Sequence, residues 1–168
     1  MILIVEGMRN SYVDSFVRKV LGKTKWPFYN YASEYVDIYN QSELNADAWY
    51  YGRDALVCSF EQYNTKDVVV SNFCFEVVAS GLVERGWSAM TTIRRAESLF
   101  KRLSDMGAVL VRCSGKDALK SAPNASGDGV VEYKTKVALL NLLYDMWPGE
   151  KRTTSVLEFD HTIYNLRI

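Results

Sequence analysis

The sequence predicts an α/β protein in three layers, with a mainly parallel sheet of about five strands between helices on both faces. Two observations predict this architecture. Short, almost continuously apolar runs, as in residues 2–5 and 107–113, are typical of strands that are covered on both sides. Segments whose apolar residues have helical spacing follow these runs, and such alternation is typical of parallel sheets.

The composition fits one folded domain over residues 1–168. The chain has 48% hydrophobic and 24% charged residues, enough for a substantial core and against disorder. Twenty basic and twenty acidic residues cancel, so no global positive field attracts a polyanion. Residues 85–168 nevertheless carry more basic than acidic residues, and residues 1–84 the reverse.

The first half of the chain predicts two strands and two helices. A strand is expected at 1–6, and a helix at 12–21 that stops at Gly22. An aromatic-rich stretch at 26–40 precedes a helix at 43–63. The β-branched run at 67–73 predicts the next strand.

The second half continues the alternation. Helical patterns at 74–85 and 89–106 lead to a buried strand at 107–113, and a long amphipathic helix is expected at 130–146. The run at 155–159 predicts a last strand. Residues 114–129, rich in Ser, Gly, Ala and Lys, predict a lid or surface loop.

Cysteine and histidine usage argues against several kinds of site. Cys58, Cys74 and Cys113 are odd in number and widely spaced, so buried free thiols in a reducing cytosol are expected. His161 is the only histidine, which argues against a His-based metal site or a catalytic triad. The N-terminal apolar run is too short for a signal peptide or membrane span, so we expect a cytoplasmic protein.

The first strand leads into an incomplete phosphate-binding pattern. Glu6 and Gly7 follow an apolar strand, as they do before a glycine-rich phosphate loop, and Asn10 and Ser11 also fit. The eight loop positions are Gly7, Met8, Arg9, Asn10, Ser11, Tyr12, Val13 and Asp14. A complete loop would have Gly, Lys and Ser or Thr at the last three of these.

On these residues and the order of elements, the chain resembles the P-loop nucleoside-monophosphate kinases, most closely the thymidylate-kinase-like group with its bacteriophage deoxynucleotide kinases. The resemblance places the family's Asp-Arg-aromatic acceptor motif at Ser71, Asn72 and Phe73, with Glu76 and Ser80 on the next helix. Only the aromatic residue matches. The family's lid arginines have no counterpart between Arg112 and Arg152, which leaves lysines, chiefly Lys116 and Lys120, as candidate lid cations.

These departures predict a degenerate ATP site. Phosphate loops work through close backbone approach, a lysine cation and a hydroxyl that holds magnesium. Tyr12 adds a ring, Val13 removes the cation, and Asp14 places a carboxylate in the first helical turn, where it complements the helix dipole. We therefore expect no catalytic residue, no bound metal and no cofactor.

Other motifs have structural interpretations. Gly22, Lys23 and Thr24 spell the missing tripeptide, but the helical pattern favours a helix end. The cations on 94–102 favour a solvated helix face over a phosphate site, and Asn124 in an Asn-Ala-Ser triplet indicates a loop. Most aromatic residues between 26 and 51 are expected in the core or at a half-buried sheet edge, although a stacking platform for a base stays open.

The resulting hypothesis is a thymidylate-kinase-like pseudoenzyme that acts as a binding or regulatory module, for a protein partner first or for a nucleotide. The resemblance makes a bacteriophage origin and the host cytoplasm part of this hypothesis. The alternative is an active deoxynucleoside-monophosphate kinase that uses ATP and Mg²⁺, with Arg9, Lys116 or Lys120 as the missing cation. A third interpretation is nucleic-acid binding by the more basic half of the chain.

Overall fold

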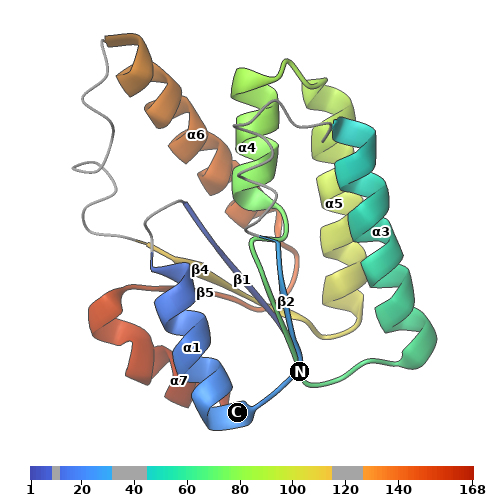
Figure 1. Cartoon of the computed structure of the whole chain (residues 1–168), viewed down its shortest axis with the longest axis vertical. Helices are drawn as coiled ribbons and strands as arrows, with labels where there is room; N and C mark the ends of the chain where they lie inside the picture. The colour runs from blue at the N-terminus through green and yellow to red at the C-terminus, as the bar shows by residue number, and fades with distance from the viewer. Residues whose placement is uncertain (9–11, 32–44, 115–126) are drawn as a thin grey trace.

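The computed structural model describes residues 1–8, 12–31, 45–114 and 127–168. Its centre is a five-stranded sheet in the order β2-β3-β1-β4-β5, and all four strand pairs are parallel (Figure 1). The strands are β1 Ile2–Gly7, β2 Phe28–Asn30, β3 Val68–Ser71, β4 Val109–Cys113 and β5 Lys151–Thr154. The predicted α/β class and mainly parallel sheet of about five strands are therefore confirmed.

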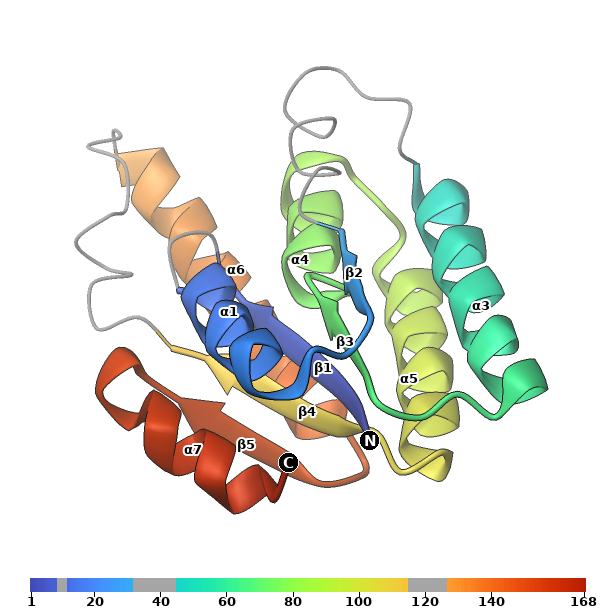
Figure 2. The same cartoon turned by 60° about the horizontal axis from the view of Figure 1, so that its bottom comes forward.

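Helices cover both faces of the sheet. The helices α3 Ala46–Tyr63, α4 Phe75–Glu84, α5 Ala89–Asp105 and α6 Gly127–Met146 pack on one face (Figure 2). The other face carries α1 Val13–Thr24 and, after the 3₁₀ turn η1 Val156–Glu158, α7 Phe159–Leu166. The predicted three layers are confirmed.

The central strand β1 shows why the sheet needs two covers. All six of its residues are buried, and their side chains alternate between the faces because successive strand residues point in opposite directions. Ile2 and Ile4 join the core under α3 to α6, whereas Leu3 and Val5 join the core under α1 and α7. A strand that feeds two cores reads as a continuous apolar run in the sequence.

The strand register brings functional candidates to one edge of the sheet. Gly7 pairs with Cys113, so β1 and β4 end at the same level, and β3 ends two residues earlier, where Ser71 pairs with Val5. Parallel sheets bind ligands beyond the carboxyl ends of their strands. We call the surface at the carboxyl ends of β1, β3 and β4 the carboxyl edge.

The C-terminal part of the chain differs from the sequence prediction. Residues 155–159, predicted as a strand, form η1 and the start of α7, and the strand lies before them as β5. β5 is an edge strand with Lys151, Arg152 and Thr153 partly exposed, so it lacks a continuous apolar run. Val156 and Leu157 are 49% and 81% exposed, which explains why their apolar character is misleading.

Three local predictions are also corrected. α1 continues through Gly22 to Thr24, and Lys25 ends it in the left-handed conformation (φ 58°). α6 begins at Gly127, inside the predicted lid, whose residues 115–126 and Asn124 lie outside the described part of the chain. Cys58 is exposed, because it lies beside the buried stripe of α3 and not in it.

No helix among the described residues combines the length and apolar character that a membrane span requires.

Two glycines on helices allow a matched test of the packing. A Cβ added to the buried Gly81 of α4 would meet the ring carbon Cε3 of Trp87 at 2.1 Å. A Cβ on Gly22 of α1 would meet nothing within 4 Å. We expect Gly81→Ala to lower the free energy of unfolding by about 1–3 kcal/mol, because the added methyl group would overpack the core against Trp87.

Gly22→Ala is the control, and we expect it to raise the free energy of unfolding by about 0.5–1 kcal/mol through helix propensity. Urea denaturation of both variants measures the two changes. A stabilised Gly81→Ala variant would contradict the packing of Trp87 on α4.

Candidate functional site

The floor of the carboxyl edge is a buried carboxyl group. Glu6, near the end of β1, has no exposed surface. Its Oε1 accepts a hydrogen bond from the Cys74 N–H at 2.7 Å, and its Oε2 accepts one from the Phe75 N–H at 3.2 Å. The side chain therefore joins the end of the central strand to the start of α4, where backbone N–H groups lack helical partners.

Burial changes the ionisation of Glu6. Desolvation raises its pKa from 4.5 to about 7, because it outweighs the hydrogen bonds from Phe75 and Cys74 and the attraction of Arg53. Burial also raises the pKa of the Cys74 thiol well above 9 and that of Cys113 to about 12, with Glu6 adding to both shifts. The two buried cysteines are therefore protonated thiols at neutral pH, unsuited to nucleophilic chemistry.

Arg53 is the buried cation of this edge. Its side chain is 1% exposed and comes from the middle of α3. Its Nε donates to the carbonyl oxygen of Phe73 at 2.8 Å, and its guanidinium carbon lies 3.9 Å from the centre of the Tyr31 ring. Arg53 and Glu6 thus hold consecutive residues of the backbone between β3 and α4.

A network of neutral polar groups lies at the ends of β2 and β3. The Ser71 hydroxyl donates to the Asn30 Oδ1 at 3.2 Å, and the Asn72 amide donates to the same oxygen at 3.3 Å. Asn72 is 6% exposed and has a left-handed backbone (φ 57°), which asparagine tolerates better than most residues. The chain turns sharply here and enters α4.

The predicted acceptor-motif residues come together at this edge. Ser71, Asn72 and Phe73 join β3 to α4, and Glu76 lies in the first turn of α4. All four are buried, as is Ser80 one turn later. Their role in binding stays a prediction.

The phosphate-loop positions are described only in part. Gly7 ends β1, Met8 packs against the larger core, and Arg9, Asn10 and Ser11 lie outside the described residues. Tyr12 precedes α1 with φ 63° and is 46% exposed. Val13 is buried at 7% exposure, and Asp14 is exposed in the first turn of α1.

The first turn of α1 therefore presents a carboxylate at its positive end. No side chain caps this end within the described residues. Asp14 complements the helix dipole, which contributes about 0.3–1 kcal/mol for an exposed group. Positions 12–14 offer neither a cationic side chain nor a hydroxyl of serine or threonine.

Among the described residues, several other candidate cations form ion pairs on the helices. Lys116 and Lys120 lie outside the described residues. Lys136 of α6 pairs with Glu84 of α4. On α5, Arg95 pairs with Asp47, Lys101 with Asp105, and Arg102 with Asp54 and Glu61. The basic face predicted on this helix is largely an ion-pair seam with α3.

The aromatic residues divide between core and surface. Trp49 is fully buried, and its ring centre lies 6.1 Å from that of Trp87. Phe28 and Tyr29 of the edge strand β2 are 38% and 44% exposed. Tyr35 and Tyr39 lie outside the described residues. Trp49 thus follows the core interpretation, and a base-stacking role for the edge residues stays open.

No group of three or more His, Cys, Asp or Glu residues in the described ranges is placed to hold a metal ion. His161 is exposed on α7 and bonds to Asn165 in the next turn.

Sequence reasoning missed Arg53, although a signal was present. The buried residues of α3 are Trp49, Arg53, Val57 and Phe60, which follow helical spacing. An arginine inside an apolar stripe has to be buried with its helix, and a buried cation needs partners. This position was the sequence-level indication of a polar site.

The raised pKa of Glu6 predicts a pH dependence of stability. Between pH 4.5 and about 7 the folded protein holds a proton that the unfolded chain has lost, so stability from this group falls as pH rises. The loss across this window is on the order of 3 kcal/mol. In Glu6→Gln the loss should be absent, since the amide does not titrate. Urea denaturation at half-unit pH steps measures this.

The control is Glu97→Gln, which removes a carboxyl group from the exposed face of α5. The wild-type and Glu97→Gln curves should run parallel, and the Glu6→Gln curve should diverge from both. Three parallel curves would show that Glu6 ionises in the folded protein as it does when unfolded.

Solved structures share this fold along the whole chain. The YorR protein of Bacillus subtilis, in complex with phosphorylated GDP, matches with a TM-score of 0.68 and 11% identity over 99% of this chain and 93% of its own. Thymidylate kinase of Ehrlichia chaffeensis matches with a TM-score of 0.59 and 9% identity over 100% and 98%. Deoxyadenosine kinase of M. mycoides, with products dCMP and a flexible dCDP, matches with 0.52 and 8% over 99% and 96%.

No protein-family model and no curated protein matches the sequence significantly. Identities of 8–11% carry the fold and not the activity. The chain has the P-loop nucleoside-monophosphate-kinase fold of the thymidylate-kinase-like type, as its sequence predicts.

Proposed function

We propose that this protein is a catalytically degenerate member of the thymidylate-kinase-like fold and acts as a binding module. Its ligand is a nucleoside monophosphate at the carboxyl edge, a partner protein, or both in a regulatory role. A bacteriophage source belongs to the same proposal and rests on the sequence resemblance alone.

The observation that carries this proposal is the first turn of α1. Val13 takes the lysine position of the phosphate loop, and its side chain is buried in the core. Asp14 takes the hydroxyl position and is exposed. A triphosphate there would meet a carboxylate without the loop lysine, so its binding would be unfavourable.

The acceptor side of the edge supports retained binding. Ser71, Asn72 and Asn30 form a connected hydrogen-bond network, and Glu6 and Arg53 bind the backbone that follows it in the chain. Amide and hydroxyl groups can recognise the edge of a base without taking part in phosphoryl transfer. Sites that bind small molecules selectively contain a few precisely placed polar groups.

A protein partner is supported by a different surface. β2 is a three-residue edge strand with Phe28 and Tyr29 exposed. Exposed aromatic residues are enriched where proteins meet. We therefore propose the exposed side of β2 as the surface that contacts a partner protein.

Steady-state formation of ADP from ATP and each deoxynucleoside monophosphate tests the degeneracy. We expect turnover well below 1 s⁻¹, since kinases of this class reach about 1–100 s⁻¹ with complete machinery. Turnover at or above about 1 s⁻¹ would replace this proposal with the active kinase that uses ATP and Mg²⁺.

Restoring the loop gives a positive test. Calorimetry should detect little binding of Mg²⁺-ATP to the wild type and clear binding to the triple variant Tyr12→Gly, Val13→Lys, Asp14→Ser. Tyr12→Gly alone is the control, because it frees the backbone without adding a cation. If the triple variant binds Mg²⁺-ATP no better than the wild type, residues 12–14 are not what blocks the site.

Binding at the acceptor side has its own matched pair. Asn72 and Asn64 are both asparagines with positive φ, 57° and 49°, but Asn64 ends α3, away from the network. We expect Asn72→Gly to weaken binding of a deoxynucleoside monophosphate about tenfold, equivalent to about 1.4 kcal/mol. Asn64→Gly should leave the affinity unchanged. Equal affinities of all three proteins would place the nucleotide elsewhere.

A further inference from the structure

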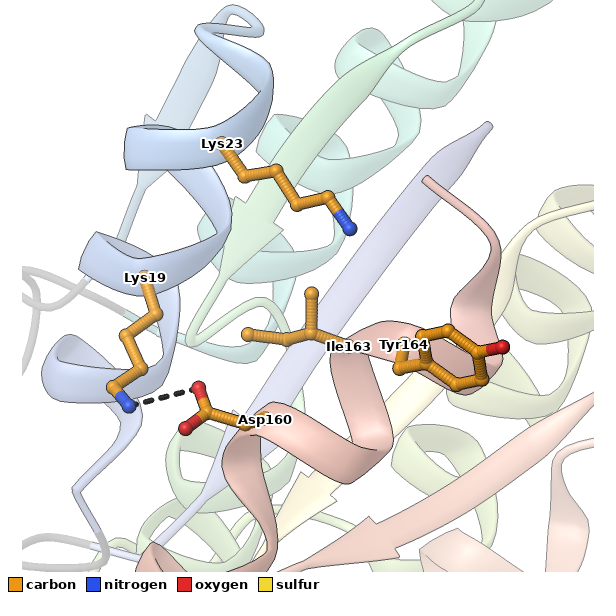
Figure 3. A pocket seen from close by; sticks show the side chains of 5 residues that line it. All are labelled: Lys19, Lys23, Asp160, Ile163 and Tyr164. Carbon is orange, nitrogen blue, oxygen red and sulfur yellow. Dashed lines mark hydrogen bonds and ion pairs between the residues drawn. The ribbon is translucent and has the colours of Figure 1, made fainter.

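A groove between α1 and α7 lies on the face of the sheet opposite α3 to α6. It is lined by Lys19 and Lys23 of α1 and by Asp160, Ile163 and Tyr164 of α7, and its volume is about 410 Å³ (Figure 3). Small-molecule sites typically occupy about 300–1,000 Å³. The groove is therefore large enough for a compact organic ligand.

The two lysines differ in their partners. Lys19 Nζ lies 2.9 Å from Asp160 Oδ1, and both side chains are half-exposed or more. Lys23 has neither a hydrogen bond nor an ion pair within the described residues, and its side chain reaches from α1 across Ile163 (Figure 3). One cation of the groove is thus free to meet a ligand, and the other is held by an exchangeable surface pair.

The α7 side of the groove is partly apolar. Ile163 is 6% exposed and packs into the core under α1, so it forms a fixed floor. Tyr164 is 76% exposed and lies on the far side of Ile163 from Asp160 (Figure 3). A flat apolar group could rest on these two residues while an anionic group meets the lysines.

The groove is separate from the carboxyl edge. Lys19 and Lys23 lie six and ten residues after Val13, which places them about 9 and 15 Å along the helix from its start. A ligand in the groove would leave the start of α1 uncovered.

We propose that this groove is a second binding site, for a small organic anion with a phosphate or carboxylate head on a flat apolar body. Lys23 pairs with the head, Lys19 joins it on leaving Asp160, and Ile163 and Tyr164 contact the body. This inference goes beyond the proposed function and does not depend on it, since no residue of the carboxyl edge takes part.

Titration of the full chain by ¹H–¹⁵N NMR tests the site, with phenyl phosphate, benzoate, inorganic phosphate and phenol as probes. We expect shifts in residues 18–24 and 159–165 with phenyl phosphate or benzoate, at Kd values below about 10 mM. The better of the two identifies the head group. Inorganic phosphate and phenol should each bind several-fold more weakly than phenyl phosphate, since each makes only half of the contacts.

Charge variants predict opposite signs. Lys23→Gln should weaken binding of the better probe roughly five- to tenfold, and Lys19→Gln should weaken it less, because Lys19 is shared with Asp160. Asp160→Asn should strengthen binding about two- to fivefold, because it releases Lys19 and removes a like charge. Lys66→Gln, at an exposed lysine beyond α3, is the control and should change nothing.

Shifts centred on residues 12–14 or on the ends of β1 and β3 would overturn the proposal, as would the absence of shifts with every probe. Equal affinities of Lys23→Gln and Lys66→Gln would overturn it as well. Because all four substituted side chains are exposed, each variant should fold, and its amide spectrum reports whether it does.

Discussion

The arrangement of the carboxyl edge depends on the carboxyl group of Glu6. The group has no contact with solvent, and it accepts hydrogen bonds from two backbone N–H groups at the start of α4. Those N–H groups lack helical partners, so leaving them unpaired in the core would cost about 1–3 kcal/mol each. Glu6 satisfies both and couples the central strand to the helix that follows β3. This arrangement places a carboxyl group in an apolar environment.

Arg53 reduces the energetic cost of burying the Glu6 carboxyl group. It lies near enough to lower the pKa of Glu6, although burial still prevails. Its Nε is satisfied by the Phe73 carbonyl, and its guanidinium stacks on Tyr31. A buried cation and a buried carboxyl group thus hold the same short backbone segment, Phe73 to Phe75, which follows the turn at Asn72. Burial and these three hydrogen bonds restrain the segment between β3 and α4.

The sequence predicted most of the fold where burial is one-sided or complete. β1, β3 and β4 are buried on both faces and read as apolar runs, and the long helices show their buried stripes. β5 was placed too late, because an exposed edge strand of Lys, Arg and Thr has no apolar signature. α7 was missed because it has only eight residues, and the exposed Val156 and Leu157 precede it. Glycine at 22 was read as a helix end, but the helix tolerates it and ends at Lys25.

The site was harder to predict than the fold, since side-chain partners come from distant parts of the chain. The polar residues at the end of β3 were named from the family pattern. The sequence does not show that Glu6 and Arg53, 47 residues apart, interact electrostatically and bind the backbone that follows β3. Periodicity reports which face a residue occupies and says nothing about its partner. The parallel register aligns the ends of β1 and β3, and the packing of α3 on the sheet brings Arg53 to the backbone that follows β3.

The last feature is the conformation and charge of the two ends of α1. Tyr12 has φ 63°, a conformation that costs a residue with a Cβ about 1–2 kcal/mol and that glycine adopts freely. Tyr12 thus adopts this conformation without the freedom of a glycine. Asp14 in the first turn and Lys23 in the last complement the helix dipole, so these two charges stabilise α1. Asp14 thus lies at the end of α1 where the dipole attracts anions, and Lys23 lies at the other end, on the groove that α1 shares with α7.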